Sequence, residues 1–292
     1  GEDNFLRYSF NLTLHSEQWN FLEKQFIEAC KLKDKIQPAI YRTQDRTQKP
    51  VPQKDLSIFT NEPDTDLDLK QNREWALSAL RKWEDMRSEN FVIPVQIGNK
   101  EVLTDKKRKY YDRSRNDEVC VCEVNLATPA QVEEIVTVAE QDKSGWRKTS
   151  LDERNRILHK TADLFSERRG DFIGCMSAVT GKTFQEGDVE VSEGTDFCRF
   201  YPVSMKAFEA LKSVSYRPKG IIWVIPPLNF PFAIPVGGVA AGLASGNRKV
   251  FLRNRFLSPV LHAINGWLYF IFEFTGFYKL FFKKIPLLAV QR

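Results

Sequence analysis

The chain has 292 residues, of which 42% are hydrophobic and 28% charged, as in an ordinary folded protein with one large domain or two smaller ones. Its net charge of +5 comes from 43 basic and 38 acidic residues that are interspersed along the chain. That mixture excludes a general electrostatic field for nucleic acid. The one dense basic run, residues 106–109, is typical of a solvated loop or a strand edge, so we expect no nucleic-acid partner.

The cysteines point to a reduced protein without a metal site. They lack the paired spacing of a zinc site and the density of a small secreted scaffold. The five are Cys30, Cys120, Cys122, Cys175 and Cys198. The first residues, GEDNFLRYSF, have no charged start followed by an apolar core, so no signal peptide is expected. The predicted location is the cytoplasm.

The first part of the chain predicts helices separated by a polar connector. Trp19 and Phe26 share one face of a helix that begins near Ser16, and we expect this face to pack against a partner. Residues 37–68 are polar and proline-bearing without helical or strand period, which predicts an extended connector lying over a surface. Residues 70–87 have the spacing of a helix.

The middle of the chain predicts an α/β layout. Apolar residues on either side of Gly98 predict a hairpin, and residues 118–124 alternate as in a strand. A helix is expected to begin at Thr128-Pro129. Further helices are predicted over residues 150–168, 171–180 and 187–211, the second of them closed by Gly181.

The segment from residue 221 to residue 252 predicts the unit on which dinucleotide sites are built. Residues 221–225 form a short apolar run, typical of a strand buried on both faces. A proline-rich turn and a small-residue helix near residues 233–244 follow, and residues 250–252 predict the next strand. Strand, turn, helix and strand in this order form a right-handed crossover of a parallel sheet.

The most informative stretch is PKGIIWVIPPLNFPFAIPVGGVAAGLASGN, residues 218–247. It resembles the aldehyde dehydrogenase superfamily, in which a strand is followed by I-x-P-W-N-x-P and then by a helix ending A-A-L-A-x-G-N. The matching positions are Ile225, Pro227, Asn229, Pro231, Ala240, Ala241, Leu243, Ala244, Gly246 and Asn247. The glycines within the helix are not a phosphate loop, and we expect them to let helix and sheet approach closely.

The resemblance implies a site at the proline-bounded turn, where an open parallel sheet binds ligands. It assigns Asn229 to the oxyanion that develops when a thiolate attacks an aldehyde, a contribution of about 3 kcal/mol. From the residues alone, an Asx turn that satisfies local backbone groups stays an alternative for Asn229. The implied cofactor is NAD, and the residues expected to contact it are Ile225, Pro226, Pro227, Leu228, Asn229 and Arg253.

Other segments resemble the branch of the superfamily that oxidises glutamate semialdehyde, the open form of pyrroline-5-carboxylate. The positions that look like its D-V-x-x-x-D-F-x-x-Y helix are Asp188, Val189, Glu193, Asp196, Phe197 and Tyr201, most of them expected to be structural. Residues 4–10 resemble the closing element of a proline dehydrogenase barrel. RTQDRTQ and NEPDTD resemble the connector of bifunctional proline-utilisation enzymes.

The resemblance gives a domain organisation. Residues 1–35 are expected to be a C-terminal remnant of a proline dehydrogenase region, residues 36–90 a connector, and residues 91–256 the N-terminal part of an aldehyde dehydrogenase cofactor-binding domain. Residues 257–292 form an atypical apolar tail. The implied fold is a partial aldehyde dehydrogenase fold, a Rossmann-like parallel sheet with flanking helices. FAD would belong only to the proline dehydrogenase part.

The sequence also departs from the family pattern. The family's tryptophan is Leu228 here, and the glutamate usual before T-G-K is Val179. The lysine that binds the adenosine ribose aligns with Leu252 without a gap, and Arg253 replaces it only after a one-residue insertion. None of the cysteines has the context of the family's nucleophile. The tail has three open interpretations: a membrane segment, a core element, or a shifted reading frame after about Asn254.

The expected function is that of a fragment of an NAD-dependent enzyme that oxidises L-glutamate γ-semialdehyde to glutamate in proline catabolism. Without the catalytic cysteine and glutamate, the chain is expected to be inactive alone. The alternative is a non-catalytic interaction or membrane-docking module derived from the same fold. Expected partners are the aldehyde in the intact enzyme and the rest of a bifunctional enzyme, with membrane contact through residues 257–292 and a homo-oligomer left open.

Overall fold

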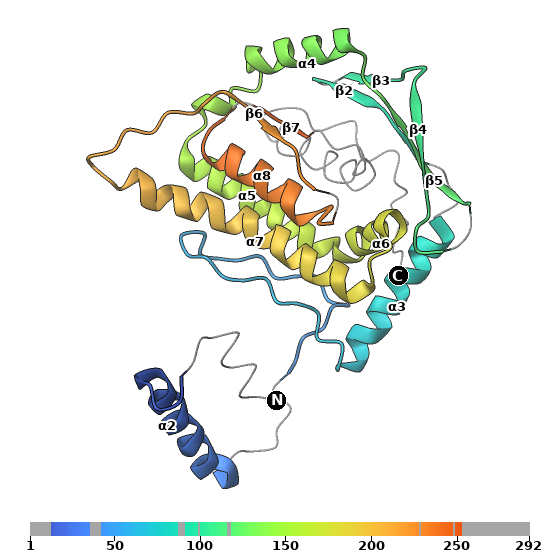
Figure 1. Cartoon of the computed structure of the whole chain (residues 1–292). Coiled ribbons are helices and arrows are strands. Elements are labelled where there is room, and N and C mark those ends of the chain that lie inside the picture. Colours follow the sequence, from blue (N-terminus) through green and yellow to red (C-terminus); the bar gives the residue numbers. More distant parts are fainter. Residues whose placement is uncertain are drawn as a thin grey trace. The chain divides into compact units, whose positions relative to one another are not determined.

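A computed structural model describes most of the chain up to residue 252 (Figure 1). The described residues are 13–35, 42–86, 91–98, 100–115, 118–227, 229–247 and 249–252. Leu228, Arg253 and the tail over residues 257–292 lie outside them. The chain divides into two compact units, residues 1–43 and 44–292.

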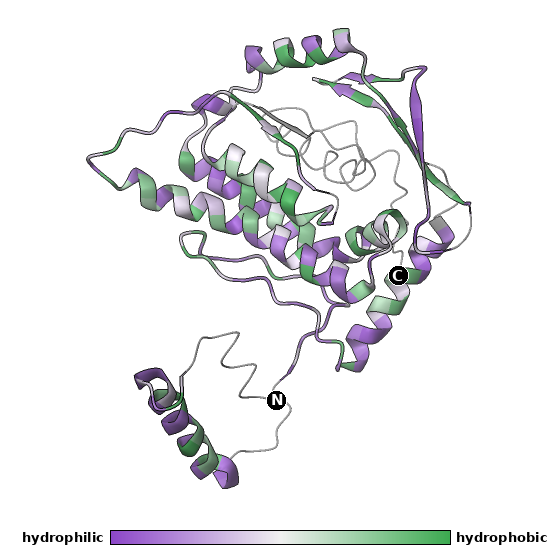
Figure 2. Cartoon of the chain, viewed as in Figure 1, coloured by the Kyte–Doolittle hydropathy of each residue, from purple (hydrophilic) through white to green (hydrophobic). Residues whose placement is uncertain are grey.

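The first unit contributes one helix, α2 (Glu17–Leu32), followed by the short 3-10 helix η1 (Lys33–Lys35). Its predicted start is confirmed, because the hydroxyl of Ser16 accepts the backbone N–H of Trp19 at 3.2 Å. No residue of α2 is buried, and Phe26 is 69% exposed. Figure 2 shows its mixed polar and apolar faces. The expectation that this face packs against a partner stays a prediction.

The expectation of a polar segment without helix or strand is confirmed for its described residues. Residues 44–69 form neither helix nor strand and run beside α7 (Phe184–Glu209) in Figure 1. The side chain of Glu62 in this segment is 7% exposed and binds three guanidinium groups. Its carboxylate accepts from Arg46 at 3.4 Å, from Arg169 at 3.1 Å and from Arg199 at 3.0 Å. The connector is thus fixed by buried charge and not by its own secondary structure.

Carboxylates of α7 hold the same connector by its backbone. Asp188 accepts the N–H and the hydroxyl of Thr65, both at 2.6 Å. Asp196 accepts the backbone N–H of Glu62 at 2.6 Å and the amide of Asn61 at 2.7 Å. These acceptors replace the partners that a helix or sheet would supply to buried backbone groups.

The helix predicted after the connector is present as α3 (Lys70–Met86). It packs on α6 (Arg169–Thr180) at two glycines. A Cβ at Gly174 would lie 2.0 Å from the indole of Trp83, and a Cβ at Gly170 would lie 2.9 Å from Ala79. Because Gly170 and Gly174 have no side chain, α3 can approach α6 closely.

A three-stranded sheet lies beside these helices, in the order β1 (Phe91–Ile93), β5 (Cys120–Asn125) and β4 (Lys107–Tyr111). β1 is parallel to β5 and β4 is antiparallel to it. β4 is the basic run, with Lys107 and Lys109 at 3.8 and 3.5 Å from the carboxylate of Glu123. The run is therefore a strand edge, one of the two forms expected for it.

The predicted hairpin consists of β2 (Val95–Ile97) and β3 (Lys100–Val102). Gly98 between them has φ of +57°, a left-handed conformation that favours glycine.

Three helices follow close to their predicted positions, although α6 begins at Arg169, two residues before the predicted residue 171. They are α4 (Pro129–Gln141), α5 (Leu151–Glu167) and α6, preceded by the N-caps Thr128 and Ser150 and, after α6, closed by Gly181. α7 begins three residues before the predicted residue 187, because Thr183 and Glu186 form a capping box.

The dinucleotide-type unit is confirmed as β6 (Ile221–Val224), α8 (Ala233–Ala244) and β7 (Lys249–Leu252), with β6 parallel to β7. The prediction that residues 221–225 are buried on both faces is wrong. Trp223 is 53% exposed, and Ile225 is 68% exposed and lies after the strand. In the described part of the chain β6 pairs only with β7 and packs on α8 by one face.

We expect Gly174→Ala to lower the free energy of unfolding by about 1–3 kcal/mol, since the new methyl group overlaps Trp83. A loss of stability would indicate a steric overlap, because alanine in an open helix interior is favoured over glycine by about 1 kcal/mol. Urea unfolding of Gly174→Ala, Trp83→Leu and the double variant measures the coupling. A stabilised Gly174→Ala protein would show that α3 does not pack on α6 in this way.

We expect Glu62→Gln to destabilise the protein by about 3–5 kcal/mol at neutral pH, because three buried guanidinium groups lose the carboxylate that they share. Burial raises the pKa of Glu62, but Arg169, Arg199 and Arg46 outweigh it and hold the pKa below its ordinary value of 4.5. The contribution of Glu62 is therefore complete above pH 4.5 and is lost as the pH falls through the lowered value.

Chemical unfolding of both proteins between neutral and acidic pH checks this expectation. Burial is the largest cause that raises the pKa of Asp163 and of Asp196, and the charge of Glu62 raises both further. The measured difference therefore includes this change in the two neighbouring carboxyl groups as well as the loss of Glu62 itself. The control is Glu153→Gln, whose exposed pair with Arg156 should matter by less than about 1 kcal/mol. A difference that does not shrink in acid contradicts the assigned role of Glu62.

Candidate functional site

The turn from β6 to α8 carries the predicted site residues. It is anchored by Phe232, which is fully buried between Phe165 at 5.0 Å and Phe172 at 4.7 Å between ring centroids. The ring of Phe232 also packs on Gly194 of α7, where a Cβ would come within 2.4 Å of it. The end of the turn is thus fixed in the main hydrophobic core.

Asn229 lies in this turn and is exposed. Its side chain makes no hydrogen bond to another described residue. The alternative of an Asx turn does not hold, because such a turn needs the backbone N–H two residues further on and Pro231 has none. Within the described part of the chain, the amide of Asn229 is therefore left without a hydrogen-bond partner.

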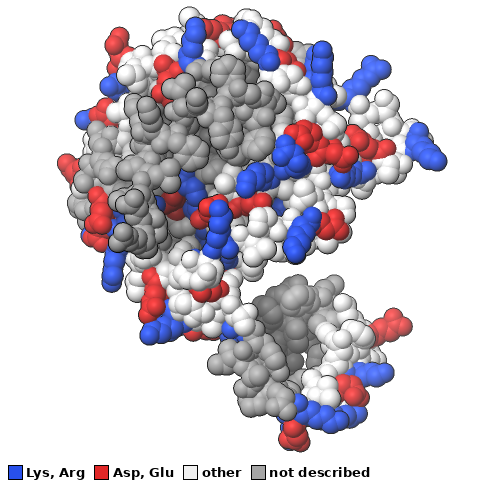
Figure 3. Space-filling model, turned by 180° about the vertical axis from the view of Figure 1, so that it is seen from behind, with Lys and Arg blue, Asp and Glu red and all other residues white. Residues whose placement is uncertain are grey.

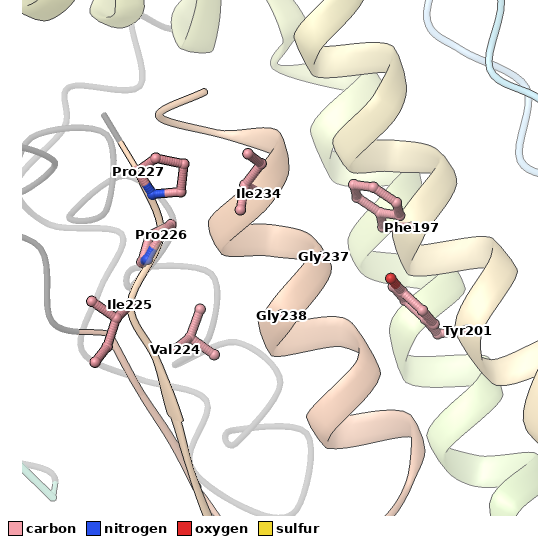
Figure 4. Close-up of a pocket in the computed structure, with 9 residues that line it drawn as sticks. All are labelled: Phe197, Tyr201, Val224, Ile225, Pro226, Pro227, Ile234, Gly237 and Gly238. Atoms are coloured by element: carbon pink, nitrogen blue, oxygen red, sulfur yellow. The ribbon is translucent and has the colours of Figure 1, made fainter. Parts of the chain in front are cut away.

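A cavity of about 270 Å³ opens beside the turn (Figure 4). Its lining residues are Phe197, Tyr201, Val224, Ile225, Pro226, Pro227, Ile234, Gly237 and Gly238. Of the predicted contact residues, the structure brings Ile225, Pro226 and Pro227 into this lining, and Asn229 is not part of it. Figure 4 shows the prolines on the β6 side and the two aromatic rings on α7 across from them.

The cavity is a narrow apolar slot. The rings of Phe197 and Tyr201 stack at 5.6 Å with an interplanar angle of 21°. A Cβ at Gly237 would lie 2.9 Å from the ring of Phe197, and one at Gly238 would lie 2.7 Å from Val224. The expectation that the glycines let helix and sheet approach closely is thereby confirmed for Gly238, whereas Gly237 lets α8 approach α7. The slot suits a flat ring or a short hydrocarbon and provides no cationic side chain.

Phe197, Tyr201 and Ile234 were not predicted as contact residues. Phe197 and Tyr201 belong to the helix pattern that the sequence predicts to be mostly structural, although a four-residue spacing places them on one face of that helix. Ile234 lies in the first turn of α8. The spacing on α7 could have suggested a shared role for Phe197 and Tyr201. The cavity that they line, however, forms only when α7 packs against α8.

Other matched motif residues have structural roles. Asn247 accepts the backbone N–H of Gly220 at 3.1 Å and donates to the carbonyl of Gly242 at 3.2 Å. It therefore ties the end of α8 to the beginning of β6. Gly246 has φ of +74°, and Trp146 donates its indole N–H to the carbonyl of Leu243 at 3.2 Å.

None of the cysteines lines the slot. Burial raises the pKa of Cys175 and of Cys198 to about 12, and it also raises the pKa of Cys122. These thiols are therefore neutral near pH 7 and behave as small apolar side chains. Cys120 is half-buried in β5, and Cys30 is exposed on α2.

Charged side chains of both signs are mixed on the face of the molecule shown in Figure 3. This distribution gives no support to a nucleic-acid interface. No helix in the described ranges combines the length and the apolar character needed to cross a bilayer.

Comparisons with known proteins agree with this architecture. The model of the aldehyde dehydrogenase family matches residues 103–261. The 1-pyrroline-5-carboxylate dehydrogenase of Oceanobacillus iheyensis is 32% identical over 213 residues, which cover 70% of this chain and 41% of that protein. The chain therefore spans less than half the length of this curated relative.

Solved structures share the fold. The 1-pyrroline-5-carboxylate dehydrogenase from Thermus with bound NAD has a TM-score of 0.65 and 26% identity, covering 75% of this chain and 43% of that one. Proline utilization A from Bdellovibrio bacteriovorus has a TM-score of 0.66 and 27% identity, covering 85% of this chain and 27% of that one. With the β6–α8–β7 unit, the proline-bounded turn and the family match in the same region, the chain belongs to the aldehyde dehydrogenase family.

Proposed function

We propose that this chain provides part of the cofactor-binding domain of an NAD-dependent enzyme that oxidises L-glutamate γ-semialdehyde to glutamate in proline catabolism. The observation that carries the proposal is the apolar slot at the carboxyl end of β6, beside the exposed amide of Asn229. Support for the substrate comes from the relatives, which are 1-pyrroline-5-carboxylate dehydrogenases and include a structure with bound NAD.

The described residues fit the ring portion of NAD better than its phosphates. The slot has flat apolar walls formed by Ile225, Pro226 and Pro227, whereas no cationic side chain lines it. The resemblance also assigns Leu228 and Arg253 to the cofactor, and both lie outside the described residues. Bound NAD would accept a hydride from the substrate.

Asn229 has a separate task in the proposed reaction. Its side-chain N–H would donate a hydrogen bond to the aldehyde oxygen as negative charge develops there, which lowers the barrier by about 3 kcal/mol. The attacking thiolate would not come from Cys175 or Cys198, whose raised pKa keeps them protonated. We therefore expect this chain alone to bind the cofactor without oxidising the aldehyde.

The proposal includes a bifunctional context. Residues 1–35 would be the end of a proline dehydrogenase region, residues 36–90 a connector, and residues 91–256 the cofactor-binding part. The similarity to proline utilization A, which covers 85% of this chain, supports this arrangement. The partners would be the small aldehyde and the rest of a bifunctional enzyme, and the compartment the cytoplasm.

A second candidate is a non-catalytic interaction module. The apolar side chains of α2 favour it, because Phe21 and Phe26 are 59% and 69% exposed. This candidate predicts no affinity for NAD, so the cofactor titration below separates the two.

We expect the purified chain to bind NAD with a Kd below about 1 mM in isothermal titration calorimetry. Ile225→Asp should weaken binding at least about tenfold, because a charged carboxylate would replace an apolar wall of the slot that receives a ring of NAD. The matched control is Leu103→Asp, since Leu103 is 67% exposed and Ile225 68%. Equal affinity of Ile225→Asp and wild type for NAD would show that the cofactor does not bind in the slot. Absence of NAD binding by the wild type would favour the interaction module.

We expect a thiol reagent at pH 7 to label Cys30 quickly in the native protein and to leave Cys122, Cys175 and Cys198 unlabelled, because burial keeps their thiols neutral. All five should react in denaturant. Intact mass and peptide mapping provide the readout. Rapid native labelling of Cys198 would contradict the assignment and reopen it as a nucleophile.

A further inference from the structure

The first turn of α8 is capped by a side chain from another helix. Phe232 is the N-cap residue of α8, and its own side chain accepts no capping hydrogen bond. Instead, Oε1 of Glu190 on α7 accepts the backbone N–H of Phe232 at 2.6 Å and that of Ala233 at 3.0 Å. The carboxylate also faces the positive end of the helix dipole. Glu190 therefore fixes the position at which α8 begins.

The second oxygen of this carboxylate binds a lysine. Oε2 of Glu190 accepts from Nζ of Lys182 at 2.5 Å, and the side chain of Glu190 is only 1% exposed. The ammonium of Lys182 lies 4.5 Å from the ring centroid of Phe230, within cation–π distance. One buried ion pair thus holds two positions of the turn, Phe230 through its ring and Phe232 through its backbone.

The turn connects β6 to α8, and residues next to both of its ends line the slot. Pro227 precedes the turn and Ile234 follows it, and Figure 4 shows them across the pocket from each other. Asn229 directly precedes Phe230, the residue under the Lys182 ammonium. A displacement of the turn would therefore move the amide of Asn229 and change the width of the slot together.

We propose that Glu190 and Lys182 are positioning residues, which hold the Asn229 turn and thereby set the geometry of the slot. Neither side chain lines the slot, so both act through the turn. The effect on NAD rests on the proposed function, whereas the effect on the turn does not. Because Glu190 fills the N-terminus of α8, that helix end is not free to bind a cofactor phosphate.

The test compares Glu190→Gln with Glu186→Gln in the full chain. Glu186 lies one helical turn before Glu190, and its carboxylate bonds Thr183 in the capping box of α7 instead of the Asn229 turn. It is therefore a matched control for the loss of a helix-capping glutamate.

Two readouts separate positioning from a role in folding alone. The first is amide hydrogen exchange of the peptide 229–236, in which Pro231 and Pro235 carry no amide proton. The second is the Kd for NAD. We expect Glu190→Gln to exchange about tenfold faster at the first turn of α8, because two charge-assisted hydrogen bonds are weakened, and to bind NAD about tenfold more weakly. Glu186→Gln should match wild type in both readouts.

The amides of α5 serve as the internal reference, since faster exchange there would indicate general unfolding. Should Glu190→Gln fail to fold, the double variant Glu190→Gln/Lys182→Met replaces it, because it leaves no unpaired buried charge.

Each outcome decides the matter. Faster exchange with weaker NAD binding, both confined to the Glu190 variant, supports the proposal. Unchanged exchange at residues 229–236 overturns it, and so does faster exchange with unchanged affinity. Faster exchange in a chain whose wild type binds no NAD overturns the proposed function and leaves Glu190 with a role in folding alone.

Discussion

Asp188 and Glu190 are buried carboxylates two residues apart on α7, and the rotation of about 100° per residue points them toward opposite sides of the helix. Asp188 accepts the backbone N–H and the hydroxyl of Thr65 and so fixes the connector. Glu190 accepts the first backbone N–H groups of α8 and so fixes the turn beside the slot. A single helix therefore aligns an irregular segment on one side with the candidate site on the other.

The use of charge in these contacts follows from the irregular backbone. A buried segment without helix or strand still has N–H groups that need acceptors, and a carboxylate can accept several of them. Arg169 then balances the negative charge, since it binds Asp188 at 2.8 Å and Glu62 at 3.1 Å. An apolar contact could bury the same area, but it could not satisfy the connector's backbone.

The slot combines small residues with aromatic rings for a related reason. Gly237 and Gly238 let α8 approach α7 and β6 closely. The stacked rings of Phe197 and Tyr201 form a flat apolar wall of the slot. The slot can therefore receive a ring but supplies no charge to hold phosphates. The residues that line the slot come from α7, from β6 with the turn that follows it, and from α8.

The sequence by itself determined the features that depend on neighbouring residues. Helix ends followed from Ser16, Thr128, Ser150 and Gly181, and the proline-bounded turn with its small-residue helix identified the family. Only the tertiary structure decided that the basic residues of β4 form a strand, because that depends on pairing with β5. It also decided the exposure of Ile225, which depends on what covers β6. It also decided the charge cluster around Glu62 and the slot, since both join residues far apart in the chain, which no local pattern can bring together.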